Sequence, residues 1–323
     1  MGIKRSTQEE FHSISDVPKE RTEGFFTDAD RRLLSLLEKL NPCDQRYYLG
    51  KRAFLVTYRQ RINLLSFLKR GRMNYTVRIV GFPVSLVKKG YFGDPVEAAE
   101  MIRALKGFTL VLNAGKDLTL PRGYTLSSYR LAITDRSFEE YLGRMRSPYR
   151  YRLNKALEKQ TLYRVERIPG EEFNQELYDL YRDVYQRSEA PLECLPLEFF
   201  REMPGEIYVF RESGRSIGFL FLAHQQDTLY FLFGGFLKED VEKYDLYYGM
   251  LIEMVKIALE KGVGFLELGQ TAEETKAKMG AEEEEKHLYL THSNPLINGI
   301  LPKLIPFGSY RPGTRRYRVF KED

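Results

Sequence analysis

Two residue types that can transfer protons, a carboxylate and a lysine, lie close together between Gly262 and Gly280. Glu267 interrupts an otherwise apolar predicted strand, and burying a carboxylate without a partner is costly. If Glu267 faces a cleft, desolvation raises its pKa toward that of a general base for an amine. The alternatives are an outward position on a half-exposed strand and a salt bridge to Lys or Arg.

The lysine of this pair is Lys276, in the segment Lys276-Ala-Lys-Met-Gly280, which follows a polar helix start. A lysine at the mouth of the preceding strand could hold a phosphate, a carboxylate or a carbonyl group. The alternative is a solvated helix lysine, which is the commonest situation of lysine in proteins.

Two consecutive glycines, Gly234 and Gly235, stand near the end of the predicted strand Leu229–Phe236. Glycine weakens a strand interior, so it usually marks a bulge or a place where something approaches the backbone closely. In one interpretation, free N–H groups at this strand end hold a thioester carbonyl or a ligand amide. In the other, a plain bulge lets a neighbouring aromatic side chain pack.

The sharpest charge feature is the stretch 144–159, where six Lys and Arg residues accompany a single acid, Glu158. On a helix, Arg152, Lys155 and Lys159 share one face. Such a strip could bind a polyphosphate, an RNA acceptor stem or an anionic polysaccharide. The alternative is a solvated helix face that nearby acids balance.

Composition and missing motifs exclude several classes of protein. The 323 residues include two distant cysteines, four histidines without metal-ligand spacing, and no apolar run of about 18 residues. A signal-peptide core, a Gly-x-Ser-x-Gly elbow, a Walker loop and a dinucleotide fingerprint are also missing from the sequence. We therefore expect a soluble, cytoplasmic protein with no metal and no transmembrane segment. The net charge of +5 permits anionic partners.

The predicted elements repeat along the chain. Each half reads as an antiparallel meander, then a helix, then a strand, and the crossover from strand 228–236 through helix 246–261 to strand 263–268 suits a parallel connection. We predict an α+β fold of two similar units, each a mixed, mostly antiparallel sheet with flanking helices. The competing prediction is one large sheet with helices on both faces. The expected boundaries are an arm and helix at 1–44, a first domain at 45–136, a connecting basic helix at 137–160 and a second domain at 161–323 that carries the candidate site.

Other segments carry more local predictions. Residues 1–26 are polar and irregular, which indicates a loosely held arm before a helix capped by Thr27. Glu282–Glu285 is expected to be an exposed loop, and the basic tail 311–320 an edge strand protected by its charge. The expected strands of the first half are 53–58, 62–68, 75–80, 109–112 and 126–133.

Four motifs of this sequence occur in an order that resembles the Fem-type and CelD-type acyltransferases of the GNAT superfamily (GCN5-related N-acetyltransferases). They are Gly234-Gly235, Tyr244-Asp-Leu-Tyr-Tyr-Gly249, Phe265-Leu-Glu-Leu-Gly269 and Lys276-Ala-Lys-Met-Gly280. The basic segment 150–156 is similar to the Arg-rich helix that opens the second domain in that family. The resemblance covers 45–310 in layout and implies two GNAT-like domains.

The resemblance also implies an activity, the transfer of an acyl or aminoacyl group to an amine or hydroxyl acceptor. By position, the donor-binding residues would be Phe233, Gly234, Gly235 and Tyr247, the catalytic residues Glu267 and Tyr248, and the substrate-binding residues Lys276, Arg150, Arg152 and Lys155. The acceptor would be a small molecule or a polymer, in cell-envelope or exopolysaccharide biosynthesis. The alternative from another class is a non-catalytic module that binds an anionic polymer or RNA through the basic helix.

The sequence departs from the family pattern where acetyl-CoA-binding members carry a glycine-rich pyrophosphate loop. Residues 237–245 contain no glycine and four acids, which repel a diphosphate. The donor is therefore expected to be either acyl-CoA or aminoacyl-tRNA, and this departure counts against acyl-CoA.

Overall fold

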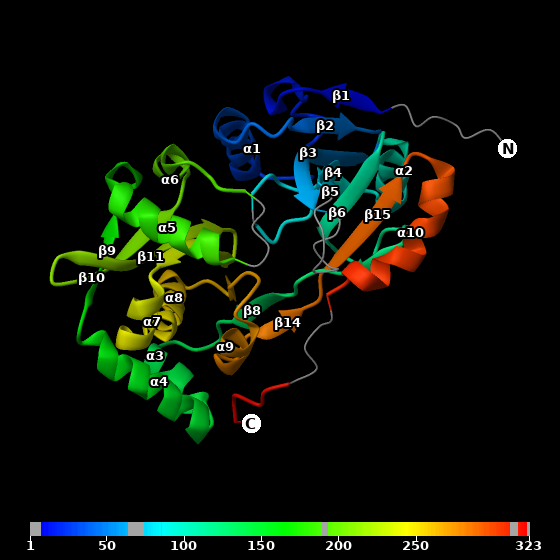
Figure 1. Ribbon diagram of the computed structural model, residues 1–323. Coiled ribbons are helices and arrows are strands. Elements are labelled where there is room, and N and C mark those ends of the chain that lie inside the picture. The colour runs from blue at the N-terminus through cyan, green and yellow to red at the C-terminus, as the bar shows by residue number, and fades with distance from the viewer. Residues whose placement is uncertain (1–7, 64–73, 85, 189–192, 311–315, 322–323) are drawn as a thin grey trace. The chain divides into compact units, whose positions relative to one another are not determined.

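The chain folds into two compact units, which Figure 1 shows in a computed structural model that describes residues 8–63, 74–84, 86–188, 193–310 and 316–321. Unit 1 comprises Met1–Ser127 and Glu285–Pro312, and unit 2 comprises Ser128–Glu284 and Gly313–Asp323. Each unit holds one sheet with flanking helices.

The sheet of unit 1 is mixed and mostly antiparallel. Its strand order is β1-β2-β3-β4-β6-β15-β7, and β5 pairs with β3. Among the pairings of the described residues, β4 and β6 are parallel, and the helix α2 (Pro95–Ala104) lies between them in the chain. The strands are β1 (Glu9–Phe11), β2 (Arg46–Leu49), β3 (Ala53–Asn63), β4 (Asn74–Val80), β5 (Tyr91–Gly93), β6 (Phe108–Ala114), β7 (Arg122–Tyr124) and β15 (His287–His292).

The sheet of unit 2 repeats this plan. Its order is β14-β8-β13-β12-β11-β10-β9, and among its described pairings β12 and β13 are the parallel pair. The strands are β8 (Ser128–Ala132), β9 (Arg164–Ile168), β10 (Glu206–Glu212), β11 (Arg215–Gln225), β12 (Thr228–Phe236), β13 (Phe265–Glu267) and β14 (Glu282–Glu284). Two sheets, each with one parallel crossover, confirm the predicted α+β fold and contradict the single continuous sheet.

Several helix ends lie where capping residues predict them, although α6 (Leu197–Glu202) and α7 (Lys238–Tyr244) were not predicted. Thr27 and Asp30 form the capping box of α1, and Asp94 caps α2 ahead of a proline. The helix α8 ends at Gly262, whose φ of 63° is the left-handed conformation that glycine adopts easily. The α-helices other than α2 have the following bounds: α1 (Asp28–Leu40), α3 (Phe138–Arg144), α4 (Ser147–Gln160), α5 (Gln175–Arg187), α6 (Leu197–Glu202), α7 (Lys238–Tyr244), α8 (Leu246–Lys261), α9 (Glu273–Lys278) and α10 (Pro295–Gly308).

Two apolar clusters hold the sheet of unit 2 between its helices. On one side, α8 packs Met250, Leu251 and Val255 into the largest core cluster of the unit. On the side of α5 and α6, an aromatic cluster forms in which the rings of Phe200 and Phe233 lie 5.3 Å apart. The sheet is therefore covered on both faces, which fixes β12 in place.

The N-terminal prediction of a loosely held arm is wrong for the described residues 8–26. Ile14 and Val17 are buried, and the Arg31 guanidinium donates hydrogen bonds to both of their carbonyl oxygens, at 2.7 and 3.2 Å. The Ile14 N–H donates to a Glu38 carboxylate oxygen at 2.7 Å. The polar composition of this segment did not indicate that it is ordered, because its hydrogen bonds go to side chains of α1 that lie far away in the sequence.

The unit boundaries also differ from the predicted ones, because strands pair across long stretches of sequence. The strand β15 joins β6 and β7, which places Glu285–Pro312 in unit 1. The strand β8 joins β13 and β14, which places it in unit 2. Glu282–Glu284 is thus a strand, although its side chains are exposed as expected.

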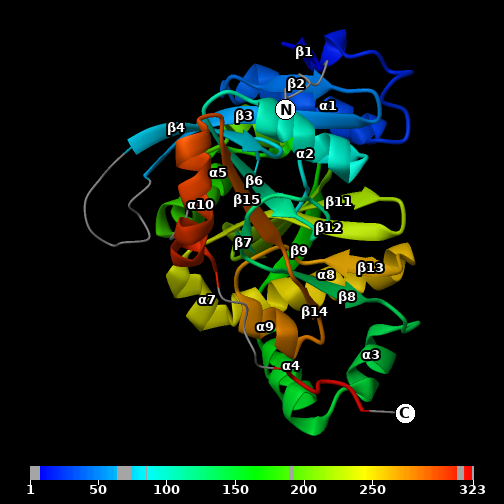
Figure 2. The same cartoon turned by 90° about the vertical axis from the view of Figure 1, so that its right-hand side faces the viewer.

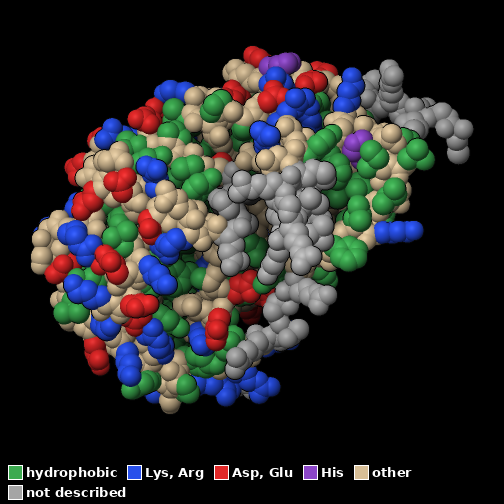
Figure 3. Space-filling model, viewed as in Figure 1, with side chains coloured by type: hydrophobic (Ala, Val, Ile, Leu, Met, Phe, Trp, Pro, Cys, Tyr) green, Lys and Arg blue, Asp and Glu red, His purple; other side chains and the backbone are tan. Residues whose placement is uncertain are grey.

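Near the C-terminus, the structure contains one helix that the sequence analysis did not predict. The helix α10 lies beside β15 and β7 of unit 1, where Figure 2 shows it, and Figure 3 shows hydrophobic side chains gathered over it. In the tail, the described residues 316–320 form one bridge, Met145 with Phe320, instead of an edge strand. The part of the predicted strand 62–68 that follows Asn63 lies outside the described residues.

Candidate functional site

The parallel strands β12 and β13 pair over only a short distance and then separate. Their register joins Thr228 to Phe265, Leu229 to Leu266 and Tyr230 to Glu267. Beyond Tyr230, β12 continues to Phe236 in pairing with β11 alone. One edge of β12 is thus not paired with β13 past this point, and a slot for a ligand beside Gly234 and Gly235 stays a prediction.

The glycines themselves have packing partners on the α5 side. A Cβ atom on Gly235 would lie 2.7 Å from the backbone nitrogen of Tyr181 and 2.8 Å from the backbone carbonyl carbon of Leu180. A Cβ atom on Gly234 would lie 3.0 Å from the ring of Phe231. Close helix packing thus accounts for Gly235, while a donor-binding role of this main chain remains a prediction.

The side chains of Phe233 and Tyr247 lie on different sides of the sheet. Phe233 is buried in the aromatic cluster beneath α5 and α6, where its ring contacts those of Phe199 and Phe200. Tyr247, in the first turn of α8, has its ring centroid 6.0 Å from that of Phe236. Burial raises the pKa of Tyr247, so its hydroxyl keeps its proton.

Lys276 and Glu267, near the end of the β12–β13 pairing, are both buried. Lys276 is 1% exposed, and its Nζ donates to the carbonyl oxygens of Gly269 at 3.2 Å and Gln270 at 2.6 Å. Glu267 is 7% exposed, and its Oε1 accepts a hydrogen bond from the Gly269 N–H at 3.1 Å. The two predicted residues therefore meet at the loop that follows β13, and Lys276 is not a solvated helix lysine.

The electrostatics of this site follow from the burial of an amine. Desolvation lowers the pKa of Lys276 to about 7, and the nearby carboxylates Glu267 and Glu273 oppose part of that shift. Near neutral pH the amine therefore exchanges its proton readily. A lysine whose charge changes in this range, held by main-chain oxygens, has the properties of a catalytic or substrate-holding group.

The loop between β13 and α9 is conformationally strained. Gly269, Thr271 and Ala272 have φ values of 72°, 65° and 49°, in the left-handed region that Thr and Ala seldom adopt. Backbone strain of this kind persists only where surrounding contacts hold it, and it concentrates at functional sites. Here the buried Lys276 and Glu267 provide those contacts.

A pocket of about 250 Å³ lies where α4, α8 and α9 of unit 2 meet. The guanidinium carbon of Arg152 is 3.7 Å from the ring centroid of Tyr248. Burial raises the pKa of Tyr248, although Arg152 opposes part of that shift, so the hydroxyl is a proton donor near neutral pH. The residues that line the pocket are Pro148, Tyr149, Arg152, Leu153, Tyr248 and Lys278.

Most of the cations in the basic strip make contacts within the protein. Both terminal nitrogens of the Arg152 guanidinium donate to the Asp245 carboxylate, and the Nη2–Oδ1 distance is 2.6 Å. Lys159 donates to the carbonyl oxygens of Glu242 and Lys243. The other two such cations are Arg144, which pairs with Asp135 at 2.7 Å, and Arg146, which donates to the Phe320 carbonyl oxygen at 3.0 Å.

Arg150 and Lys155 form no ion pair with the described residues, and the Lys155 Nζ lies 4.8 Å from the ring centroid of Tyr151. The predicted substrate-binding residues are therefore split. Arg152 lies at the pocket, whereas Lys155 is exposed to solvent and Arg150 partly so.

We expect Arg152→Met to destabilise the protein by about 1–2 kcal/mol, because it removes a bidentate ion pair that joins α4 to the junction of α7 and α8. The figure is modest because the Arg152 side chain is 37% exposed. Urea unfolding measures the change, and Arg150→Met on the same helix is the matched control, with an expected change within about 0.5 kcal/mol. Equal effects of the two substitutions would show that the ion pair contributes nothing.

The start of α8 does not fit the pyrophosphate of coenzyme A. In place of a glycine-rich loop, the acidic helix α7 precedes α8, and Asp245 separates the two helices. The Asp245 carboxylate is held by Arg152 at the point where main-chain N–H groups would have to hold a diphosphate. The residues present thus support the sequence-based argument against acyl-CoA.

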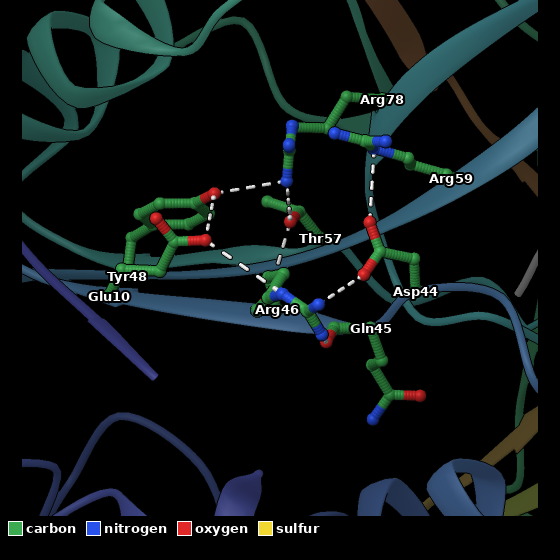
Figure 4. Close-up of polar contacts among 8 residues, drawn as sticks. All are labelled: Glu10, Asp44, Gln45, Arg46, Tyr48, Thr57, Arg59 and Arg78. Atoms are coloured by element: carbon green, nitrogen blue, oxygen red, sulfur yellow. Dashed lines mark hydrogen bonds and ion pairs between the residues drawn. The ribbon is translucent and has the colours of Figure 1, made fainter. Parts of the chain in front are cut away.

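A polar cluster in unit 1 was not indicated by any sequence motif (Figure 4). The Arg78 guanidinium donates to the Tyr48 hydroxyl at 3.0 Å and to the Thr57 hydroxyl at 3.3 Å, and no carboxylate of the described residues pairs with it. Asp44 holds the two neighbouring arginines instead. Strand register brings these side chains together, and the sequence alone does not reveal register. The drawn residues are Glu10, Asp44, Gln45, Arg46, Tyr48, Thr57, Arg59 and Arg78.

The described residues hold neither a metal-binding cluster nor a membrane-spanning helix. They contain no group of three or more His, Cys, Asp or Glu side chains placed to bind a metal ion. The helices in the described part of the chain include none with the length and apolar character of a membrane span.

Comparisons with known proteins concern the family of one region and the fold of the whole chain. Residues 143–277, which include β12, α8, β13 and most of α9, match the family model of the acetyltransferase (GNAT) domain. No curated protein sequence matches the chain.

Three solved structures share the fold over most of the chain. A C-terminal domain named for a lysylphosphatidylglycerol synthetase of Agrobacterium fabrum has 12% identity and a TM-score of 0.52, covering 87% of this chain and 91% of its own. L-PGS from Bacillus licheniformis has 11% identity and a TM-score of 0.52, covering 85% and 96%. FemX has 14% identity and a TM-score of 0.50, covering 92% and 99%. The GNAT family match thus concerns residues 143–277 of unit 2, and the chain as a whole shares its fold with FemX and the two other structures.

Proposed function

We propose that this protein transfers an aminoacyl group from aminoacyl-tRNA to an amine or hydroxyl group of a cell-envelope acceptor, and that it does so in the cytoplasm. The observation that carries the proposal is the burial of Lys276 and Glu267 side by side at the point where the pairing of β12 with β13 ends. Acyl transfer requires a proton acceptor and a hydrogen-bond donor that stabilises the oxyanion. Glu267 supplies the first and Lys276 the second.

Each buried group has a defined task in the proposed reaction. The acceptor nitrogen or oxygen attacks the ester carbonyl carbon of the donor, and Glu267 takes the proton that the acceptor loses. A charged lysine has three N–H donors, and the carbonyls of Gly269 and Gln270 engage two of them. The third N–H stabilises the developing oxyanion. The C–O bond to the tRNA ribose then breaks as Glu267 passes the proton taken from the acceptor to the ribose oxygen.

Two observations favour aminoacyl-tRNA over acyl-CoA as the donor. The α7 acids and the Asp245–Arg152 pair occupy the start of α8, which leaves no cradle for a diphosphate. FemX and the domain from Agrobacterium fabrum share the fold of this chain. The name of the Agrobacterium protein, lysylphosphatidylglycerol synthetase, denotes the attachment of a lysyl group to phosphatidylglycerol. An ester-linked aminoacyl donor suits a site without a pyrophosphate cradle.

The non-catalytic alternative, binding of an anionic polymer by the basic helix, has less support. Of the strip's cations, Arg144, Arg146, Arg152 and Lys159 already have partners within the chain. Polyanion binding is favourable because cations of the protein displace the counterions of the polymer. Cations that are already paired within the protein contribute little to it.

A thermal-shift and transfer experiment distinguishes the two donors. We expect tRNA charged with radiolabelled amino acids to raise the melting temperature by about 5 °C at saturation, because a native-state ligand stabilises by mass action. Acetyl-CoA should leave it unchanged, and uncharged tRNA controls for nucleic-acid binding alone. A shift with acetyl-CoA, together with no label transfer from charged tRNA to phosphatidylglycerol or to amine acceptors, would refute the proposal.

A further inference from the structure

The helix α10 of unit 1 exposes apolar side chains along its outward face (Figure 3). Its inner face buries Leu301 and Ile305. Single exposed apolar residues are ordinary, but a cluster on one element marks an interaction surface. The exposed side chains, with their exposed fractions, are Leu296 (81%), Ile297 (39%), Ile300 (55%), Leu304 (50%) and Phe307 (69%).

The orientation of α10 is fixed by specific contacts with β7 and β15. A Cβ atom on Gly123 would lie 2.7 Å from the Ile305 side chain, so the helix packs directly onto the backbone of β7. The Ser309 hydroxyl accepts a hydrogen bond from the Tyr124 N–H at 2.7 Å. The Asn298 side chain accepts one from the His292 N–H at 3.1 Å. The outward face is therefore presented by a docked helix, as Figure 2 shows.

The spacing of the exposed residues makes a continuous stripe. Leu296, Ile300, Leu304 and Phe307 are separated by four, four and three positions, which places them one above another on a helix. A helix at the surface of a soluble domain normally carries polar residues on this face. The only charged residue of α10 is Lys303, which is exposed.

We propose that α10 docks unit 1 onto the surface of a bilayer that contains anionic lipid, independently of the transferase proposal. The charge pattern fits that partner, because the sequence from Lys286 to Phe320 contains no Asp or Glu and the chain carries a net charge of +5. Helices that lie in the membrane interface combine an apolar face with cationic residues, and α10 carries Lys303 beside its apolar stripe.

The dimensions of α10 exclude a spanning position. Its 14 residues extend about 21 Å, well short of the ~30 Å hydrocarbon core, so the helix lies in the plane of the interface. A second copy of the chain is the less suitable partner. A stable dimer buries roughly 800 Å² on each side, which is more than one stripe of four side chains supplies.

The protein contains no tryptophan, which allows a clean fluorescence test. Phe307→Trp places a single reporter on the stripe, and Tyr151→Trp places one at an equally exposed position of unit 2. With vesicles of phosphatidylglycerol and phosphatidylcholine, we expect the emission of the first variant to shift to shorter wavelength and that of the second to stay unchanged. No shift for Phe307→Trp, or equal shifts for both, would overturn the proposal.

Vesicle flotation of the full chain tests the stripe itself. We expect Ile300→Asn with Leu304→Asn to lower binding to anionic vesicles by about 10- to 100-fold, since each inserted apolar side chain contributes about a factor of ten. The matched control, Val96→Asn with Leu162→Asn, removes two apolar side chains that are 56% and 54% exposed elsewhere and should bind like the wild type. Unchanged binding of the stripe variant, or a wild-type dimer that the stripe variant converts to monomer, would contradict membrane docking.

Discussion

Replacing Lys276 with methionine lowers kcat/KM for aminoacyl transfer by about 10²- to 10³-fold, the usual effect of removing one oxyanion donor. Methionine keeps the length and apolar stem of the side chain but cannot donate a hydrogen bond to the reacting carbonyl. A transfer assay with charged tRNA measures the loss. Lys261→Met is the matched control, because that lysine pairs with Glu206 at the opposite end of α8 and should retain nearly full activity.

The pH dependence of Lys276 gives this prediction a signature that a merely structural role lacks. The proposed role needs the charged amine, so kcat/KM should fall as the pH rises through about 7, the pKa of Lys276 in the folded protein. If activity instead rises through this range, the neutral amine is the active form and Lys276 acts as a base. In that case the assignment of the proton acceptor to Glu267 is wrong.

Stability should move in the opposite direction with pH. The folded pKa of about 7 lies below the ~10.4 of an unfolded lysine, so between these values the unfolded chain binds more protons and stability rises with pH. We expect the free energy of unfolding of the wild type, relative to Lys276→Met, to increase by on the order of 2 kcal/mol from pH 7 to pH 9. Urea unfolding of both proteins at each pH tests this, and a flat difference would mean that the amine is not desolvated.

Gly235→Ala destabilises the protein by about 2–3 kcal/mol, because the added methyl group meets both the Phe219 ring and the backbone of α5, and that backbone cannot turn away. The Cβ position is 2.7 Å from the backbone nitrogen of Tyr181. Relief requires moving α5 off the sheet, which opens the aromatic cluster beneath it. Chemical denaturation measures the loss.

The matched control for this substitution is Gly143→Ala in α3, where a Cβ atom meets nothing within 4 Å. There alanine should stabilise by roughly 0.5–1 kcal/mol, as in other helix interiors. If Gly235→Ala costs less than about 0.5 kcal/mol, the packing of α5 against β12 is not as close as described. The contrast also shows that lost activity in a Gly235 variant does not by itself demonstrate donor binding.

Local features were predictable because they depend on neighbouring residues. The capping box at Thr27, the proline start of α2 and the glycine end of α8 are set by contacts within a few positions of the chain. The helix α10 was missed because its apolar residues occupy both faces, so the amphipathic period that identifies a helix is weak. The strand β14 was missed because its three glutamates pair through the backbone alone.

The sequence by itself determined the α+β class, the crossover from β12 through α8 to β13 and the proximity of Glu267 and Lys276 to the end of β13. The tertiary structure decided what these residues contact. Burial of Lys276 against the carbonyls of Gly269 and Gln270, the partnership of Arg152 with Asp245, and the return of β15 to unit 1 all join positions that the local pattern does not relate. Desolvation, and with it the pKa of a lysine, depends on how the whole unit packs around the side chain, so it became visible only in the folded protein.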